Sequence, residues 1–421
     1  MRILHTSDWH LGQHFMGKSR EQEHHAFIDW LLNTVDQQKV DALLIVGDVF
    51  DTGTPPSYAR TLYNQFIVRL QKTHCKQLVI VGGNHDSVAT LNESKDLLAC
   101  LNAHVIGGVS IKAEDQIIEL KDSKGVSGAI ICAIPFIRPR EVLESRAGES
   151  GADKQQALQE AIARHYQTVF EAAESKANNS LPIIATGHLT TVGGQLTESV
   201  REIYIGTLTA FPASAFPKAD YIALGHLHRG QTVANQEHIR YSGSPIPLSF
   251  DEASSPKQVL LVDFVNASLK TVTSIEIPVF RPLHCIKGSL STIENVLEEK
   301  LSDLPIDKQS ADNSLKSWLE IEIITDDYLS DLQARVEQLI EKYHVELLRV
   351  RKKREKNSNL TASDNRETLS ELKVNDVFMQ RIQDEELSND KASLLENAFN
   401  EILSDIEEDT SASERMPVEV R

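Results

Sequence analysis

Six runs of apolar residues, each of strand length, most constrain what this chain can fold into. They are continuous rather than alternating, which is typical of strands buried on both faces of a sheet. Two helical patterns, at residues 27–35 and 62–70, separate the first three runs. Strands that alternate with helices predict a layered α/β domain. The runs are residues 2–4, 42–46, 78–81, 130–134, 183–185 and 221–224.

Five of these runs are followed by a cluster of polar residues. Each cluster alone is as readily a turn or an exposed loop. Together they favour one shared site, because open α/β sheets bind ligands at the carboxyl ends of their strands. Four of them carry a glycine just before the polar residue, which permits a sharp turn or a close approach to a bound group. The clusters read DWH (8–10), GDVFD (47–51), GGNHD (82–86), GH (187–188) and GHLH (225–228).

The side chains in these clusters are typical ligands of a divalent metal ion. They include no thiolate, and oxygen and imidazole ligands suit Mn²⁺, Fe²⁺ or Zn²⁺. Seven ligands are too many for one tetrahedral ion, but they suffice for two ions about 3.5–4 Å apart that share a carboxylate. Such a pair of ions favours in-line displacement at phosphorus. The candidate ligands are Asp8, His10, Asp48, Asn84, His188, His226 and His228.

The order of the five clusters resembles the calcineurin-like metallophosphoesterase superfamily. Longer phrases, among them HTSDWHLGQ, GNHDSVATLNES, YIALGHLHR and YSGSPIPLSFDE, are similar to the nuclease subunits of bacterial SbcCD-type complexes. The resemblance implies an α/β fold, with a layered metallophosphoesterase β-sandwich flanked by helices. It also implies a small α+β capping domain and a C-terminal helix–loop–helix.

The resemblance implies a role for each candidate ligand. Asp48 would bridge two divalent ions, with Mn²⁺ the most expected. His85 would be catalytic, either protonating the leaving oxygen or stabilising the charged transition state. One ion would be held by Asp8, His10, Asp48 and His228, and the other by Asp48, Asn84, His188 and His226.

The roles of two further carboxylates, those of Asp51 and Asp86, stay open. Asp51 stands where related archaeal proteins have a second catalytic histidine, so a helix cap or a support for a ligand is equally consistent with its position. Asp86 either orients His85 or serves only the turn.

Trp9 lies between two of the candidate ligands. Because side chains alternate along an extended chain, we expect Asp8 and His10 to point one way and Trp9 the other. Trp9 would then anchor this strand end in the packed layer behind the site.

Composition and apolar patterning divide the chain into five predicted parts. Residues 374–382 and 394–406 are amphipathic, and their apolar faces need either a partner or the parent domain. By resemblance they would grip the coiled coil of an ATPase subunit. With the roles that the resemblance implies, the parts are a nuclease domain (1–275), a DNA-capping domain (276–355), a linker (356–365), a docking helix–loop–helix (366–408) and an acidic disordered tail (409–421).

The charge distribution does not by itself identify a partner. The formal net charge is −18, but residues 384–421 alone hold twelve acidic and three basic residues. One run is strongly basic and is either a solvated strand end or a set of contacts to DNA phosphates. It consists of Arg349, Arg351, Lys352, Lys353 and Arg354.

The sequence predicts a cytoplasmic, nucleoid-associated protein without a membrane segment. It holds no apolar run long enough to span a bilayer and no apolar leader at its start. Its four cysteines are widely spaced and form no CxxC motif, which favours free thiols in a reducing compartment.

We therefore predict the nuclease subunit of an ATP-dependent DNA repair and recombination complex. The resemblance implies 3′–5′ exonuclease activity on duplex ends and endonuclease activity on single strands and hairpins. It also implies an SbcC-type ATPase partner, two copies of each subunit, and a homodimer formed through residues 58–71, although packing within the monomer explains that helix as well. The chain has no GxxxxGK[ST] P-loop of its own. A metallophosphatase acting on small molecules or proteins, and a non-catalytic scaffold subunit, are the alternatives.

Overall fold

The structure of the chain is a computed structural model in which two units separate, residues 1–355 and residues 356–421. It describes residues 1–143, 151–178, 180–200, 210–289, 292–301, 315–324 and 332–353, together with residue 395. The predicted linker, docking helices and acidic tail lie outside the described residues, apart from residue 395. The same is true of Arg354.

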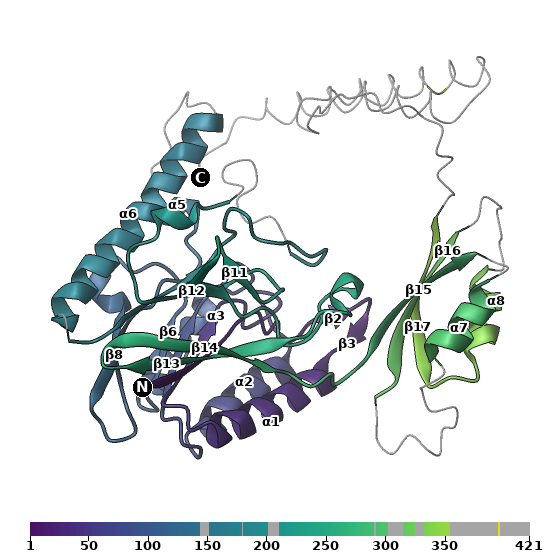
Figure 1. Cartoon of the computed structure of the whole chain (residues 1–421), viewed down its shortest axis with the longest axis horizontal. Coiled ribbons are helices and arrows are strands. Elements are labelled where there is room, and N and C mark those ends of the chain that lie inside the picture. The colour runs from purple at the N-terminus through teal and green to yellow at the C-terminus, as the bar shows by residue number, and fades with distance from the viewer. Residues whose placement is uncertain are drawn as a thin grey trace, which may run out of the picture. The chain divides into compact units, whose positions relative to one another are not determined.

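Two six-stranded sheets form the body of the first unit (Figure 1). In the first sheet, four neighbouring strands run parallel to one another. The two strands that come last in the sequence form an antiparallel pair, and the inner one is also antiparallel to the first strand of the chain. In spatial order the six strands are β14 (Ser268–Glu276), β13 (Gln258–Val265), β1 (Arg2–Thr6), β4 (Ala42–Val46), β5 (Gln77–Val81) and β6 (Ala103–Ile106).

The second sheet has four parallel strands between two antiparallel edge strands. In spatial order these are β11 (Gln231–Val233), β12 (Gln236–Tyr241), β10 (Tyr221–Gly225), β9 (Ile183–His188), β8 (Ser127–Cys132) and β7 (Ile117–Lys121). The six apolar runs of the sequence fall on β1, β4, β5, β8, β9 and β10, as predicted, although residues 133–134 of the fourth run lie just beyond β8.

Three apolar layers hold the sheets and helices together. In β4, Leu44 and Val46 face the second sheet, where they pack in a cluster with Ile131 and Ile184. The alternate residues of the first sheet pack against α1 (Glu21–Gln37) and α2 (Ser57–Leu70). The outer face of the second sheet packs against α6 (Gly151–Ala177). Figure 1 shows α1 and α2 on one side of the two sheets and α6 on the other. The predicted layered α/β sandwich is confirmed.

Short elements connect these layers. They include α3, α4 and α5, three 3-10 turns and a two-stranded hairpin that follows β1. Their bounds are α3 (Val88–Asn92), α4 (Lys95–Ala99), α5 (Pro139–Val142), η1 (Ala113–Gln116), η2 (Ala213–Ala215), η3 (Phe250–Glu252), β2 (His14–Phe15) and β3 (Lys18–Ser19).

A small domain follows the first unit's sandwich and consists of three parallel strands alternating with two helices. Residues 345–353 of the third strand pair in parallel with residues 317–324 of the second. An apolar cluster that includes Leu297, Ile321 and Val336 packs the helices on the sheet. The elements are β15 (Leu283–Ser289), α7 (Ile293–Leu301), β16 (Ser317–Ile324), α8 (Leu332–Ile340) and β17 (Val345–Lys353). Among all described residues, no helix has the length and hydropathy to cross a bilayer.

Trp9 provides a test of this packing. Its ring is fully buried and makes edge contacts with Phe27 of α1 and Phe66 of α2, at centroid separations of 5.4 and 5.0 Å. Trp9→Ala should therefore lower the free energy of unfolding by about 3–5 kcal/mol, measured by urea titration in EDTA. Val68→Ala, which truncates a half-exposed residue of α2, should change it by less than about 0.5 kcal/mol. A loss below about 1 kcal/mol for Trp9→Ala would contradict the anchoring role.

Candidate metal centre

The candidate ligands come from loops at the carboxyl ends of strands in both sheets. Asp8 and His10 follow β1, Asp48 follows β4 and Asn84 follows β5. In the second sheet, His188 ends β9, while the loop after β10 contributes two more ligands. All are buried except Asn84, which is half-buried. The strands therefore bring together all seven residues that the sequence singles out.

The backbone reaches this arrangement through left-handed turns. Asp8, His10 and Asp48 have φ angles of 55°, 45° and 49°, a region that costs residues other than glycine about 1 kcal/mol or more. The peptide N–H groups of Asp8 and His10 donate to the carbonyl oxygens of Gly47 and Asp48, both at 3.0 Å. This corrects our expectation of an extended segment. Asp8 and His10 do reach the same point, but through two left-handed residues rather than through strand alternation.

Two glycines allow the loops to approach each other. A Cβ at Gly47, whose φ is +80°, would lie 2.0 Å from Nδ1 of His188. A Cβ at Gly83 would lie 2.1 Å from Oδ1 of Asp48. Any side chain at either position would displace a candidate ligand, which explains why glycine precedes these polar residues.

The ligand atoms form two compact groups. Asp8, His10 and His228 offer atoms that all lie within 4.8 Å of one another, and so do Asp48, His188 and His226. Asn84 adjoins the second group, with its Oδ1 atom 3.0 Å from Nε2 of His188 and 3.2 Å from Nδ1 of His226. We call these the first and second ligand groups.

One oxygen atom of the second group, Oδ2 of Asp48, also lies near a histidine of the first group. Oδ2 of Asp48 is 3.6 Å from Nε2 of His10 and 3.2 Å from Nε2 of His188. Its other oxygen, Oδ1, accepts a hydrogen bond from the peptide N–H of His85 at 2.9 Å. Nε2 of His10 is buried and has no hydrogen-bond partner among the described residues. Carboxylate, amide and imidazole donors around an unpartnered ring nitrogen fit a pair of divalent cations bridged by Asp48.

Electrostatic coupling within the second group is strong in the metal-free protein. Burial lowers the pKa of His188, but the Asp48 carboxylate outweighs it and raises this pKa to about 9. Burial acts in the opposite sense on Asp48, whose pKa is nevertheless held well below its usual range by His188 and His10. Burial and then the charge on His188 lower the pKa of His226. The metal-free group therefore holds its extra proton on His188.

His85 lies beside the first group with a fixed ring. Its Nδ1 atom is 2.7 Å from the carbonyl oxygen of Asp51, and its ring centroid is 4.8 Å from that of His10. The peptide N–H of His85 is tied to Asp48, as described above. These contacts place an imidazole next to the Asp48 carboxylate.

The structure narrows the open interpretations of Asp51 and Asp86. Oδ1 of Asp51 is 3.1 Å from Nδ1 of His10, and α2 begins at Ser57 with Pro56 at its cap, so Asp51 contacts a candidate ligand rather than capping that helix. Asp86 accepts three peptide N–H bonds that join the loops after β4 and β5. Burial and then the charge of Asp48 raise the pKa of Asp86 to about 6.

Sequence reasoning missed the residues that surround His228. Nδ1 of His228 lies 2.6 Å from Oγ of Ser199 and 3.5 Å from Oε1 of Glu252. Lys257 donates to the carbonyl oxygen of His228 at 2.9 Å. Glu252 does belong to the phrase YSGSPIPLSFDE, which offered the one available signal.

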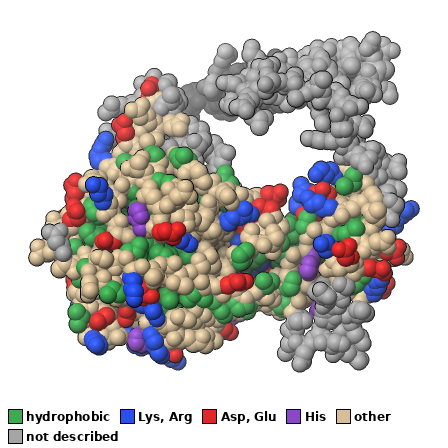
Figure 2. All heavy atoms as spheres, viewed as in Figure 1, with side chains coloured by type: hydrophobic (Ala, Val, Ile, Leu, Met, Phe, Trp, Pro, Cys, Tyr) green, Lys and Arg blue, Asp and Glu red, His purple; other side chains and the backbone are tan. Residues whose placement is uncertain are grey.

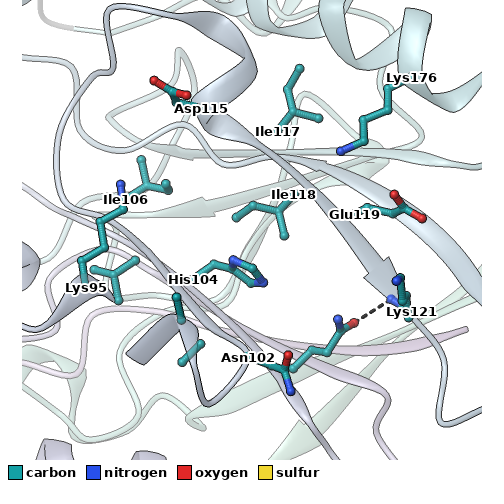
Figure 3. A pocket seen from close by; sticks show the side chains of 14 residues that line it. Lys95, Asn102, His104, Ile106, Asp115, Ile117, Ile118, Glu119, Lys121 and Lys176 are labelled. Carbon is teal, nitrogen blue, oxygen red and sulfur yellow. Dashed lines mark hydrogen bonds between the residues drawn. The ribbon is translucent and has the colours of Figure 1, made fainter. Parts of the chain in front are cut away.

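A separate pocket of about 460 Å³ lies away from these residues (Figure 3). It is lined by side chains of the edge strands β6 and β7, and by Lys95 and Lys176, whose amino groups reach toward it. None of the seven candidate ligands lines it.

Two family descriptions match the chain. Residues 1–230 match calcineurin-like phosphoesterases, and residues 279–386 match a domain described as the type 5 capsule protein repressor C-terminal domain. The D subunit of the nuclease SbcCD from Escherichia coli K12 is 51% identical over 404 residues, which cover 96% of this chain and 98% of that protein. The chain belongs to the SbcD family of calcineurin-like phosphoesterases.

More distant relatives carry the same name. The corresponding SbcCD nuclease protein of Rhodobacter capsulatus is 36% identical and covers 68% of this SbcD-family chain and 71% of its own length. That of Bacillus subtilis is 32% identical and covers 78% of this chain and 81% of its own length. Among solved structures, a β-glucosidase from Exiguobacterium marinum aligns over 83% of this chain and 88% of its own with 9% identity and a TM-score of 0.20, too slight a likeness to bear on fold or function.

In this SbcD-family chain, the described residues of the basic run lie on β17 beside acidic residues. Arg349 and Arg351 pair with Glu320 of the neighbouring strand β16, and Lys353 pairs with Glu322. Figure 2 shows basic and acidic side chains next to each other on the visible face of the small domain. Any phosphate contact made by these residues competes with the glutamates.

The coupling of His188 and Asp48 predicts how the metal-free protein responds to pH. Because the pKa of His188 is raised from 6.5 to about 9, its stabilising contribution is full below pH 6.5 and is lost as the pH rises through 9. In EDTA, the free energy of unfolding should fall by up to about 3 kcal/mol between pH 6.5 and 9.5. His188→Gln should flatten this part of the profile. A wild-type profile that is flat over the same range would contradict the coupling.

Proposed function

We propose that this chain is a metal-dependent DNA nuclease that hydrolyses phosphodiester bonds with two divalent ions, Mn²⁺ above others. The observation that carries the proposal is Oδ2 of Asp48, which lies between two buried ligand groups. The names of the relatives, which describe one component of a nuclease called SbcCD, support a nucleic acid as the substrate, and the resemblance described in the sequence analysis favours DNA. Bound ions would supply an acidified water and offset the negative charge of the phosphate.

Each ligand group would hold one ion. Asp8, His10 and His228, with Asp48, form the site for the first ion. Asn84, His188 and His226, with the same Asp48, form the site for the second. The chain's contribution is to hold these groups in a buried, rigid arrangement before any ligand arrives.

His85 is the proposed catalytic residue. Its ring is oriented by the carbonyl oxygen of Asp51, so its position relative to the ligand groups is fixed. From there it would protonate the leaving oxygen or stabilise the charge that develops on the phosphate.

We further propose 3′–5′ exonuclease activity on duplex ends, endonuclease activity on single strands and hairpins, and control by an SbcC-type ATPase at the nucleoid. The relatives' names support an SbcCD-type complex, in which residues 366–408 would dock the coiled coil of the partner. Two copies of each subunit would assemble. Most apolar residues of α2 are buried in the monomer, so a dimer through this helix would use its outer face, which includes the exposed Val68.

A substrate comparison tests the proposed function. The protein, with and without a co-expressed SbcC-type ATPase, is assayed with Mn²⁺ or Mg²⁺ on duplex ends, hairpins and a phosphomonoester. We expect DNA cleavage with Mn²⁺. Rapid phosphomonoester hydrolysis with DNA left intact would instead support a metallophosphatase, and inactivity on every substrate would support a scaffold subunit.

His85→Ala should lower the rate of DNA cleavage by about 10²–10⁴-fold, because it removes the proton donor and leaves the ligand groups in place. Mn²⁺ binding, measured by calorimetry, should be unchanged within about twofold. His25→Ala, which truncates a half-exposed histidine of α1, is the matched control and should cleave at the wild-type rate. Normal cleavage by His85→Ala would refute its catalytic role.

A further inference from the structure

A serine and a buried carboxylate contact His228 on the Nδ1 side of its ring. Oγ of Ser199 lies 2.6 Å from this nitrogen, and the serine hydroxyl donates in turn to Oε1 of Glu252. Thr197 donates to the same oxygen at 3.0 Å. This arrangement places the ring proton on Nδ1 and leaves the Nε2 lone pair for an ion, as outer carboxylates do for metal-binding histidines.

The second oxygen of Glu252 fixes the backbone around His228. Oε2 accepts from the peptide N–H of Leu248 at 3.1 Å and forms an ion pair with Lys257. Lys257 also donates to the carbonyl oxygen of His228 at 2.9 Å. The ion pair with Lys257 places a buried cation beside the Glu252 carboxylate.

The turn that carries Glu252 also carries a contact to the small domain. Phe250, in the same 3-10 turn, lies 5.1 Å from the ring centroid of Phe15. Phe15 stacks on Trp318 of β16, with a centroid separation of 5.4 Å and an interplanar angle of 10°. With Leu283, these rings form one buried apolar cluster. The small domain therefore packs against the turn that supports His228.

Buried charges make a second connection to the same segment. The guanidinium carbon of Arg281 lies 4.3 Å from the ring centroid of Trp318, and Arg281 donates to Glu23 at 3.0 Å. Glu23 also pairs with Arg20. Arg20 donates at 2.7 Å to the carbonyl oxygen of Pro247, the residue before Leu248. All the charged side chains in this chain of contacts are buried.

The second ligand group has a different support. Nδ1 of His188 lies 3.2 Å from the carbonyl oxygen of Val46, at the end of β4. Its Nε2 side faces Asn84 and Asp48. These supports come from the sandwich itself, so movement of the small domain should leave them in place.

We propose that Glu252 is a positioning residue for His228, and that Trp318 holds Glu252 in place through the Phe15–Phe250 contact. The packing of the small domain against the sandwich would then determine the affinity of the first ligand group for its ion. The affinity of the second group would not change. This inference rests on the proposed two-ion site. Under this proposal the small domain supports a metal ligand of the sandwich, in addition to any contact that it makes with DNA.

Mn²⁺ titration of the DNA-free full chain, by calorimetry and by the electron paramagnetic resonance signal of free Mn²⁺, tests the proposal. The variants are Glu252→Gln and Trp318→Ala. Each should weaken one of two Mn²⁺ sites by at least tenfold, in line with the usual effect of removing an outer partner of a metal-binding histidine, and leave the other unchanged. Trp318→Phe, which retains a stacked ring, should restore most of the lost affinity.

Two controls separate this coupling from a general loss of structure. Glu298→Gln removes an exposed carboxylate of α7 and should bind Mn²⁺ as the wild type does. Val336→Ala loosens the core of the small domain without touching the Trp318 contact, and it should also bind two ions normally. If Glu252→Gln fails to fold, Ser199→Ala, which removes the hydroxyl next to Nδ1 of His228, takes its place and should weaken the same site.

The possible outcomes are distinct. The inference would be overturned if Trp318→Ala and Glu252→Gln (or Ser199→Ala in its place) both bound Mn²⁺ with wild-type affinity at both sites. That result would leave the proposed function intact. Equal weakening of both sites by Trp318→Ala would also overturn the inference, because the second group should not respond. A wild-type protein that binds no Mn²⁺ would overturn the proposed function and this inference together.

Discussion

The buried carboxylate of Asp48 is the interaction on which the rest of the site depends. A lone charge in this position would be costly to desolvate, so it requires positive partners on both sides. His10 and His188 approach the same oxygen from opposite ligand groups, while the peptide N–H of His85 occupies the other oxygen. The left-handed residues and the close-approach glycines of the surrounding loops all serve this convergence.

The packing of two sheets sets the geometry of the centre. The first sheet supplies Asp8, His10, Asp48 and Asn84 from the first hundred residues, and the second supplies three histidines from residues 188–228. Neither sheet alone completes a ligand group. The apolar cluster between the sheets, which includes Leu44, Val46 and Ile184, therefore fixes the relative position of the two halves of each group.

Much of this arrangement could be predicted from residue patterns. Continuous apolar runs identified the central strands, and polar clusters after them identified the edge where the ligands meet. Three features escaped prediction, and two of them, the turns near β1 and the support of His228, depend on tertiary structure. The turns at Asp8 and His10 are left-handed, so strand alternation gave the right meeting point for the wrong reason. Helix α6 was missed although Leu158, Ile162 and Tyr166 lie four residues apart. The support of His228 by Glu252 joins loops that no local motif connects.

Our central proposal is that Asp48 would serve as a ligand to both ions, and the electron paramagnetic resonance spectrum of the Mn²⁺-loaded protein tests it most directly. Two Mn²⁺ ions sharing a carboxylate oxygen should give a spin-coupled spectrum at two ions per chain, and Asp48→Ala should abolish that coupling and weaken both sites. Two magnetically isolated ions in the wild type, or a spectrum unchanged by Asp48→Ala, would contradict the account.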